Sequence, residues 1–500
     1  MTDPLASLRR QAKELRRAYD WGDAAARSRV AAQMRQPPEP LRHADALHVL
    51  AREAGYPSWP AMKFTVETEG MDRAALQQRL KIALAQGQTW VVQRLLQDTP
   101  DLARGLFGLE VALYDRPAVE AALAENPDRA VALAGPVRPI LHLARSRMHQ
   151  VWPEKVPDMI AIAQMLVTHG ADVNDAIPHE DGPLSALYLA LGHADNLTLA
   201  RWLLEQGADP NDGESLYHAT ELPHADGVRL LLDHGARPAG TNALLRAIDK
   251  DDEDKIALLL AAGADPNERA AGGPGIPVLH HLARRGASEP VCRALLEAGA
   301  DTWQRYQGAS AYAFARVYGN RALAALLEAA GVDQSLTKEE ALLAAAAEGV
   351  PPPGQYIDPA KLSGAYADLL VEIVPLEGRS GHVKALVGIG MDYDRPDTNG
   401  LSPVQIAGWE GLPDMLAYFI DLRPDLSRVN GFGGTLLTTI LHGSENHPAK
   451  ETRDHLECLR IVLDHGLALP RKAVDFAGEP EVAAFLSDWA RAHPGQVVDA

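Results

Sequence analysis

Short leucine-rich segments recur through the middle of the chain, and the same polar motif follows each of them. Residues 199–206 place leucine and tryptophan side chains at helical spacing, and Gly207-Ala-Asp-Pro-Asn211 comes next. The spacing predicts a short helix with one apolar face, and the glycine can adopt the left-handed conformation that ends a helix. Asp and Asn then favour a turn by bonding to their own backbone. Altered copies of this unit occupy residues 163–174, 227–237, 256–267 and 291–301.

The glycines that end these helices set the period of the repeat. Their steps scatter around roughly 33 residues, as in an array of helix pairs whose loops vary in length. A second apolar segment, such as 278–283 or 312–315, precedes each leucine-rich helix and predicts the first helix of its pair. Each unit of such a solenoid contacts only its neighbours, so the core grows linearly along the chain. These glycines are Gly170, Gly207, Gly235, Gly263, Gly299 and Gly331.

The first 73 residues follow another pattern and predict a small helical module. Asp3-Pro4 is a favourable helix start, and after a proline-rich break at 36–40 a second helix is expected from about His43 to Ala54. A charged helix face is usually solvated, and contact with an acidic array is the other simple explanation here. The first helix has an apolar face of Leu5, Leu8, Ala12, Leu15 and Tyr19, and an opposite side with Arg9, Arg10, Lys13, Arg16 and Arg17.

The same patterns divide the whole chain. The first two units of the array are degenerate, and an insertion at about 148–157 interrupts a later one. Residues 336–380 form either an irregular repeat or a joint, with helices expected at 338–349 and 362–374 around a proline-rich break. The expected domains are the N-terminal module at 1–73, an array at 74–335, the irregular segment at 336–380, a second array with a C-terminal cap at 381–490, and a tail at 491–500.

Composition and charge support a helical, acidic protein. Hydrophobic residues make up 46% of the chain but aromatic residues only 5%, because Ala and Leu dominate, as in closely packed short helices. Lys and Arg total 48 and Asp and Glu total 67, so the net charge is −19. That balance disfavours nucleic acid and anionic lipid and favours a partner with a basic or mixed-charge surface. No segment has the length and apolar character of a membrane span or signal peptide, so a cytoplasmic location is expected.

The repeated units resemble a known family. The motif Gly207–Asn211 with its copies, the first-helix segment Ile140-Leu-His-Leu-Ala-Arg145, and Ser402-Pro403 are similar to the motifs of ankyrin repeats. The resemblance covers about residues 74–490, although the family's Thr-Pro-Leu-His start is mostly absent. The N-terminal module resembles a segment that precedes the array in many bacterial ankyrin proteins. The resemblance implies an all-α ankyrin-repeat solenoid of about 11 helix-pair units, preceded by a small helical module.

Candidate chemistry is sparse, and we assign no catalytic, cofactor-binding or metal-binding residue. The resemblance implies that His142 and His280 bond to backbone between repeats. His280 and His281 point about 100° apart on a helix, so they do not suit one metal ion. Two cysteines cannot form a disulfide framework, and both lie in leucine-rich runs, where burial is expected. A serine triad could be written only from His442, Ser444 and Asp454, without the sharp turn that such a serine needs.

The resemblance implies a non-enzymatic module for protein–protein interaction. Such stacks bind through a concave face lined by first helices and hairpin tips, and Tyr, Trp and Arg usually dominate protein contacts. An aromatic residue on a short helix is as readily buried between repeats as exposed. Large side chains that depart from the repeated pattern are the candidates for binding: Tyr188, Tyr217, Trp303, Arg305, Tyr306, Tyr312 and Trp409.

The expected partner is a protein with a basic or mixed-charge surface that meets an acidic concave face. Two alternatives stay open. One is a regulator whose basic N-terminal helices bind nucleic acid, since residues 1–36 carry eight basic and four acidic side chains. The other is an enzyme with a site in the irregular segments 336–380 or 433–455, because long irregular segments are often functional.

Overall fold

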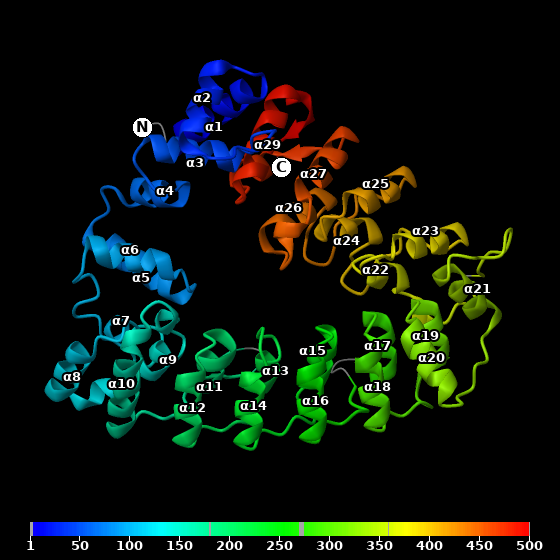
Figure 1. Ribbon diagram of the computed structural model, residues 1–500, viewed down its shortest axis with the longest axis horizontal. Helices are drawn as coiled ribbons and strands as arrows, with labels where there is room; N and C mark the ends of the chain where they lie inside the picture. The colour runs from blue at the N-terminus through cyan, green and yellow to red at the C-terminus, as the bar shows by residue number, and fades with distance from the viewer. Residues whose placement is uncertain (1–3, 180–181, 270–274, 359, 500) are drawn as a thin grey trace.

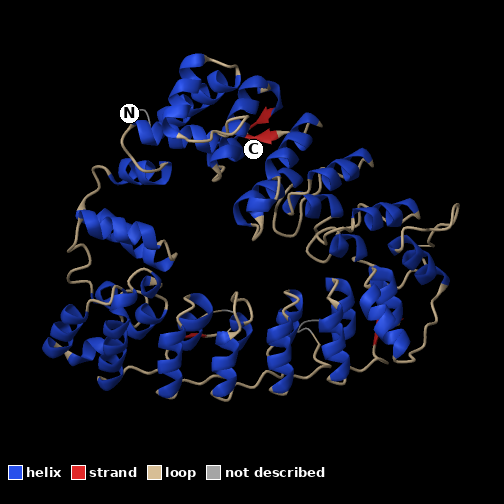
Figure 2. Ribbon diagram, viewed as in Figure 1, coloured by secondary structure: helices blue, strands red, loops and turns tan. Residues whose placement is uncertain are grey.

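The computed structural model describes the chain except for residues 1–3, 180–181, 270–274, 359 and 500. Short helices stack in pairs along the described chain (Figure 1), and the few strands have two residues each (Figure 2). The predicted all-α solenoid of helix pairs is confirmed. The division into domains stays a prediction, and the structure adds the arrangement of the elements within each part.

The N-terminal segment folds around a core of its own. Leu5, Ala12, Leu15 and Tyr19 of the predicted apolar face are buried, and Leu8 packs against them. This cluster extends to Met62 and is separate from the large cluster that runs through the array. Asp23 and Ser58 cap two of the helices by accepting bonds from backbone N–H groups. The helices are α1 (Pro4–Asp20), α2 (Ala24–Gln33), α3 (His43–Glu53) and α4 (Trp59–Thr68).

The array follows as helix pairs in two layers. From α11 to α18, the first helix of each pair lies on the inside of the curve and the second on the outside (Figure 1). The first helices are α5 (Arg73–Ala85), α7 (Phe107–Ala112), α9 (Pro139–Ala144), α11 (Ala186–Tyr188), continued by the π-helical η4 (Leu189–His193), α13 (Ser215–Ala219), α15 (Ala243–Asp249), α17 (Val278–Arg285) and α19 (Ala311–Tyr318). Their partners are α6 (Thr89–Asp98), α8 (Arg116–Glu125), α10 (Val156–Thr168), α12 (Leu197–Glu205), α14 (Asp226–Asp233), α16 (Glu253–Ala261), α18 (Glu289–Glu297) and α20 (Arg321–Ala329).

Short strands and 3₁₀ turns fill some of the loops. The antiparallel hairpins are β1 (Ala176–Ile177) with β2 (Leu184–Ser185), and β3 (Arg305–Tyr306) with β4 (Ala309–Ser310). The 3₁₀ turns in this part are η1 (Pro127–Ala130), η2 (Met148–Gln150) and η3 (Pro153–Lys155), of which the last two occupy the segment predicted as an insertion.

The polar motif after each outer helix joins neighbouring repeats. Gly207 has a φ of +96°, as expected for a glycine that ends a helix. Asp209 accepts a bond from the backbone of Asn211, which makes the predicted local turn. The side chain of Asn211, however, bonds to the next repeat: it donates to Gly235 O and accepts from Arg237 N at 2.8 Å. Our expectation that this asparagine bonds its own backbone was therefore wrong, because the adjacent turn is within its reach. Asn174 and Asn267 make the same inter-repeat contacts.

The segment 336–380 continues the stack. The helix α21 (Lys338–Ala347) agrees with the prediction and packs against α19 on one side and α23 (Ser380–Gly388) on the other. The predicted helix at 362–374 is instead split into η5 (Gly364–Tyr366) and α22 (Leu369–Ile373). Tyr366, the last residue of η5, is buried, and its hydroxyl donates to the carboxylate of Glu340 at 2.7 Å.

The last part of the chain repeats the two layers. Its inner helices are α24 (Pro403–Trp409) and α26 (Leu436–Asn446), and its outer helices are α25 (Pro413–Asp421) and α27 (His455–Asp464). The 3₁₀ turn η6 (Lys450–Thr452) lies in the loop between α26 and α27. The chain ends with α28 (Arg471–Phe476), α29 (Pro480–Ala492) and η7 (Pro494–Gln496), and with a parallel pair, β5 (Leu469–Pro470) and β6 (Val497–Val498).

The chain curves so far that its two ends meet. Figure 1 shows the helices following an almost closed ring, with α1–α3 beside α29, and α3 contacts α29 directly. Both cysteines, Cys292 and Cys458, are free and buried, as predicted. Across the described residues, no helix is both long enough and apolar enough to cross a membrane.

Candidate binding surface

Two of the predicted tyrosines lie together on the inner helices. Tyr188 of α11 and Tyr217 of α13 are both partly exposed, and the ring of His218 lies between them. The ring centroids are 4.8 Å apart for Tyr188 and His218, and 5.0 Å apart for Tyr217 and His218. The guanidinium of Arg246 on α15 lies 5.9 Å from the ring centroid of Tyr217. We call these four residues the inner aromatic patch.

A row of charged pairs continues from this patch along the inner helices. Glu221 accepts from His218 Nδ1 at 2.7 Å and from Arg246 Nη2 at 2.6 Å. Asp249, at the end of α15, contacts His281 at 2.8 Å and Arg285 at 2.7 Å, both on α17. The Glu221–Arg246 pair is open to solvent, and such a pair contributes only about 0–1 kcal/mol. The Asp249–His281 contact is largely buried, since the two side chains are 20% and 4% exposed. The inner face is therefore of mixed charge here, because its acids are matched by bases.

These charged residues were missed from the sequence, although a signal for them exists. Glu221, Asp249 and Arg285 stand at or just after the ends of successive first helices, and Arg246 lies one turn before the end of α15. Aligning the units on their first helices would have placed them in one row. Their pairing depends on how closely the inner helices approach one another, which only the fold sets.

Replacing Asp249 by asparagine should remove a stabilising contribution that depends on pH, because it requires the ionised carboxylate. Burial raises the pKa of Asp249, but the hydrogen bond from His281 and the charge of Arg285 outweigh burial and lower the pKa to about 2. A lowered carboxyl pKa stabilises the fold above the unfolded value, and this stabilisation is lost as pH falls from about 4 to about 2. Asp249→Asn should therefore cost about 2 kcal/mol at pH 7 and about half of that at pH 3, measured by urea unfolding.

The control for this variant is Asp233→Asn, because Asp233 is an exposed acid on α14. A deficit of Asp249→Asn that stays the same between pH 7 and pH 3 would contradict the assigned pairing.

The other predicted residues fall in two further places. Trp303, just before the β3–β4 hairpin, is 71% exposed, and Arg305 is exposed, with Nη1 donating to Gly308 O. Tyr306 is partly buried, with its ring centroid 6.1 Å from that of Phe314. Trp409 lies on α24, across the ring from α11 in Figure 1, and is partly buried against the ring of His442.

Tyr312 is not a surface residue, and its prediction as a binding residue was wrong. Tyr312 is part of α19 and only 3% exposed, because its ring belongs to the hydrophobic core of the array. Its hydroxyl donates to Glu328 at 2.8 Å and accepts from Arg316 at 2.7 Å. A helical pattern in which nearly every position of α19 is apolar does not distinguish this tyrosine from an exposed one.

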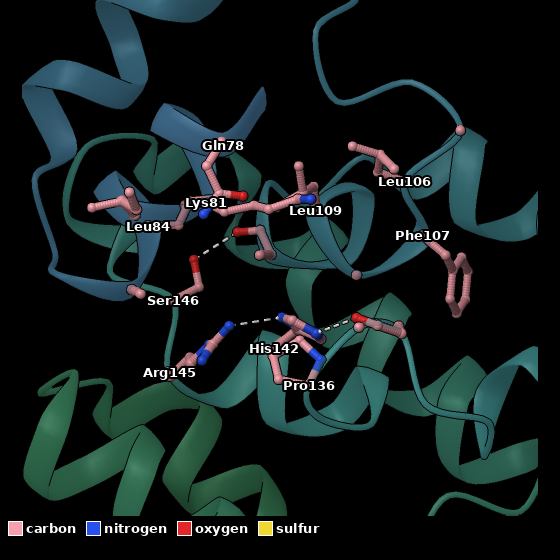
Figure 3. A pocket seen from close by; sticks show the side chains of 17 residues that line it. Gln78, Lys81, Leu84, Leu106, Phe107, Leu109, Pro136, His142, Arg145 and Ser146 are labelled. Atoms are coloured by element: carbon pink, nitrogen blue, oxygen red, sulfur yellow. Dashed lines mark hydrogen bonds between the residues drawn. The ribbon is translucent and has the colours of Figure 1, made fainter. Parts of the chain in front are cut away.

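A cavity of about 610 Å³ opens between α5, α7 and α9. Figure 3 shows Arg145 and His142 side by side on its wall, with Lys81 from α5 on the other side. Arg145 Nη2 contacts His142 Nδ1 at 3.1 Å, and the side chain of Arg145 has no carboxylate partner in the part of the chain that the structure describes. Burial lowers the pKa of both side chains, that of His142 to about 4. A cavity of this size with a mainly apolar lining suits a small ligand or a partner side chain.

The histidines of the first helices bond to backbone, as the resemblance implied, with one difference. His280 Nε2 contacts Ala309 O of the next unit at 3.1 Å. His142 Nε2 contacts Ala134 O at 2.8 Å, in the loop that leads into its own helix. Ala134 precedes Ile140, where the unit of His142 was predicted to begin, so both histidines bond to a neighbouring unit: His280 to the next one and His142 to the one before it.

The residues of the conceivable serine triad do not meet. Ser444 Oγ donates to Leu441 O, His442 contacts Asn446, and Asp454 caps α27 by accepting from Glu457 N. Within the described residues, no three His, Cys, Asp or Glu side chains are grouped so that they could hold a metal ion.

Comparison with known proteins finds similarity in the segment that contains the inner aromatic patch. The family model "Ankyrin repeats (3 copies)" matches residues 187–270. The chain is similar to the human ASB11 ankyrin repeat domain, with 20% identity over 42% of this chain and 90% of that chain and a TM-score of 0.33. It is similar to an ankyrin repeat domain from Acinetobacter baumannii AYE, with 25% identity over 39% and 98% and a TM-score of 0.32. A third is the ankyrin repeat domain of Bcl-3, with 19% identity over 50% and 97% and a TM-score of 0.22.

A search of curated protein sequences finds no match to this chain. The segment matched by the family model begins one residue before Tyr188 and includes Tyr217, His218 and Arg246. The inner aromatic patch therefore lies within that segment. Residues 187–270 of this chain therefore match ankyrin repeats, which are a general protein–protein interaction module.

Proposed function

We propose that this protein is a non-enzymatic binding module that holds a segment of a partner protein against its inner helices. The inner aromatic patch carries the proposal. Tyr188 and Tyr217 are partly exposed, lie within the matched repeats, and are held in place by His218 and Arg246. Rigid aromatic side chains with a polar end and a neighbouring arginine are the typical anchors of protein interfaces.

The proposed partner presents a basic or mixed-charge surface. The net charge of −19 favours approach of a basic partner over long distances. Close to the patch, Glu221 and Asp249 are already paired with Arg246 and Arg285. A partner segment that carries both signs of charge can replace the Glu221–Arg246 pair at little cost, because a pair that is open to solvent is weak.

The test uses the full chain as bait and compares four baits by pull-down and by a binding titration of the captured partner. Tyr188→Ala/Tyr217→Ala should weaken binding about 30-fold or more, as expected when hot-spot side chains worth about 2 kcal/mol are truncated. The matched control is Tyr356→Ala/Phe432→Ala, which removes two aromatic side chains that are 67% and 77% exposed elsewhere. A thermal melt of each bait checks that it is folded.

The fourth bait, Trp303→Ala/Arg305→Ala, tests the hairpin. It leaves Tyr306 in place, because that side chain packs against Phe314 and its removal would disturb the core. Undiminished binding by Tyr188→Ala/Tyr217→Ala together with loss of binding by the hairpin variant would move the site to the hairpin. Undiminished binding by both would refute both choices of surface.

A further inference from the structure

The two ends of the chain meet at a contact with excess positive charge. Asp488 of α29 lies 3.7 Å from Lys13 and Arg16 and 3.4 Å from Arg17, all three on α1. The same carboxylate also pairs with Arg491 of its own helix. One carboxylate is thus shared by four cations, in a protein that is strongly acidic overall. Of the two explanations left open for the basic face of the first helix, contact with the acidic array applies to Lys13, Arg16 and Arg17, which lie beside the C-terminal helix α29.

A cavity of about 530 Å³ lies at this contact, and its charged lining is basic. Arg9, Arg10 and Lys13 of α1 face Arg491 of α29 across it, and among the described lining residues there is no carboxylate. Arg9 and Arg10 form no ion pair with any described residue. The rest of the wall is built from small side chains, chiefly alanines of α29. We call this space the seam cavity.

A buried histidine, His43, forms part of the wall of the seam cavity. Its side chain lines the seam cavity and is only 2% exposed, yet its Nδ1 atom has no hydrogen-bond partner among the described residues. A buried polar atom without a partner costs about 1–3 kcal/mol, so such atoms are rare unless something else satisfies them. Burial, and then the charges of Arg16 and Lys13, lower the pKa of His43 to about 4, so the ring is neutral at pH 7. A neutral imidazole can offer a hydrogen bond to a bound group without adding to the charge.

We propose that the seam cavity binds a small molecule that carries phosphate groups. Guanidinium groups bind phosphate oxygens in pairs of parallel hydrogen bonds, and Arg9, Arg10 and Arg491 supply three of them around one space. A phosphate group carries about 1.5 to 2 negative charges at pH 7, which matches a site of several cations better than a single carboxylate does. The volume of the cavity lies within the usual range for small-molecule sites.

Such a ligand would hold the ring closed. Its phosphate oxygens would contact α1 and α29 at once, and these helices come from opposite ends of the chain. A ligand that binds only when both helices are in place stabilises the closed arrangement by its own binding free energy. This inference does not depend on the proposed partner site, because the two sites share no residue.

The test titrates the full chain with inorganic pyrophosphate by calorimetry at constant ionic strength. We expect saturable binding at one site. Arg9→Ala/Arg10→Ala should weaken it at least tenfold, or about 1.4 kcal/mol. The control Arg35→Ala/Arg104→Ala removes two exposed arginines that lie outside the cavity, and it should bind as the unchanged protein does. Ser487→Asp, which places a carboxylate in the cavity wall, should also abolish binding, and it checks the result if the double variant is unstable.

Two outcomes would overturn the proposal. The first is absence of saturable pyrophosphate binding. Equal weakening of binding in the two double-arginine variants counts as the same outcome, because binding would then depend on the overall charge of the protein and not on the seam cavity. The second is tighter binding of a single-stranded oligonucleotide than of pyrophosphate at equal phosphate concentration, which would indicate a nucleic-acid surface instead.

Discussion

Replacing Gly443 by alanine should destabilise the C-terminal part of the array by about 3 kcal/mol, because two inner helices approach each other too closely at this point for a methyl group. A Cβ atom at Gly443 in α26 would lie 2.4 Å from the carbonyl oxygen of Trp409, the last residue of α24. It would also lie 2.8 Å from Nε2 of His455, which contacts that same carbonyl at 2.8 Å. The backbone of α24 cannot move aside cheaply, since α24 and α26 are in contact along their length.

The expected cost combines two effects and one small compensation. Overpacking costs about 1–3 kcal/mol, and loss of the bond between His455 and Trp409 adds about 1–3 kcal/mol. Alanine is the better helix former by about 1 kcal/mol, which offsets part of the sum.

Urea unfolding and hydrogen exchange measure this effect together. Exchange of the α24 and α26 amides should accelerate most, because each repeat depends on its neighbours. Gly388→Ala is the matched control, since Gly388 lies in α23 and a Cβ there would meet nothing within 4 Å. That variant should be neutral or slightly stabilising. A Gly443→Ala protein as stable as the unchanged chain would show that α24 and α26 are less closely packed than the structure has them.

Arg284→Met should destabilise the protein by about 3–5 kcal/mol at pH 7, because it leaves a largely buried carboxylate without its cation. Arg284 Nη1 contacts Glu372 Oε1 at 2.9 Å, and the two side chains are 18% and 23% exposed. The buried hydroxyl of Tyr318 donates to the other oxygen of Glu372. This network joins α17 and α19 to α22, so its loss weakens the contact across the irregular segment.

The dependence on pH identifies the cause. Burial raises the pKa of Glu372 above its usual value, and the charge of Arg284 opposes this effect. Without Arg284 the pKa should rise further. A carboxyl whose pKa is raised in the folded state does not destabilise the fold below its unfolded pKa, and destabilises it as pH rises through the folded value. The deficit of Arg284→Met should therefore be small near pH 4 and grow toward pH 7.

The control for this experiment removes the charge of the acid as well. Arg284→Met/Glu372→Gln should show a deficit that does not change between pH 4 and pH 7, measured by urea unfolding. A deficit of Arg284→Met that is equally independent of pH would contradict the role assigned to Glu372.

The repeat architecture follows from the sequence because its causes are local. The spacing of apolar residues predicted the helices, including α21 within the predicted 338–349. The glycines that follow the outer helices predicted the turns. A one-sided apolar face placed Leu5, Ala12, Leu15 and Tyr19 in a core. These features depend on residues a few positions apart, so a pattern in one segment is enough to predict them.

The candidate surface was only partly predictable. Tyr188 and Tyr217 lie on the inner helices as expected, whereas Tyr312 is buried. Tyr312 stands two residues after its capping serine, Ser310, which is the position that the buried Leu187 occupies after Ser185, whereas Tyr188 stands three residues after that cap. Alignment of the units on their capping serines would therefore have predicted the burial of Tyr312.

By itself, the sequence determined the helix pairs, their period and the turns between them, because each rests on contacts within one unit. The tertiary structure alone decided that Gly443 touches Trp409, that Asn211 reaches the next repeat, and that Asp488 receives the basic face of α1. The last of these depends on the whole array. Each repeat is rotated slightly against the one before it, and the rotations add up along the solenoid. Small differences in packing at every step therefore decide whether the two ends of the chain meet.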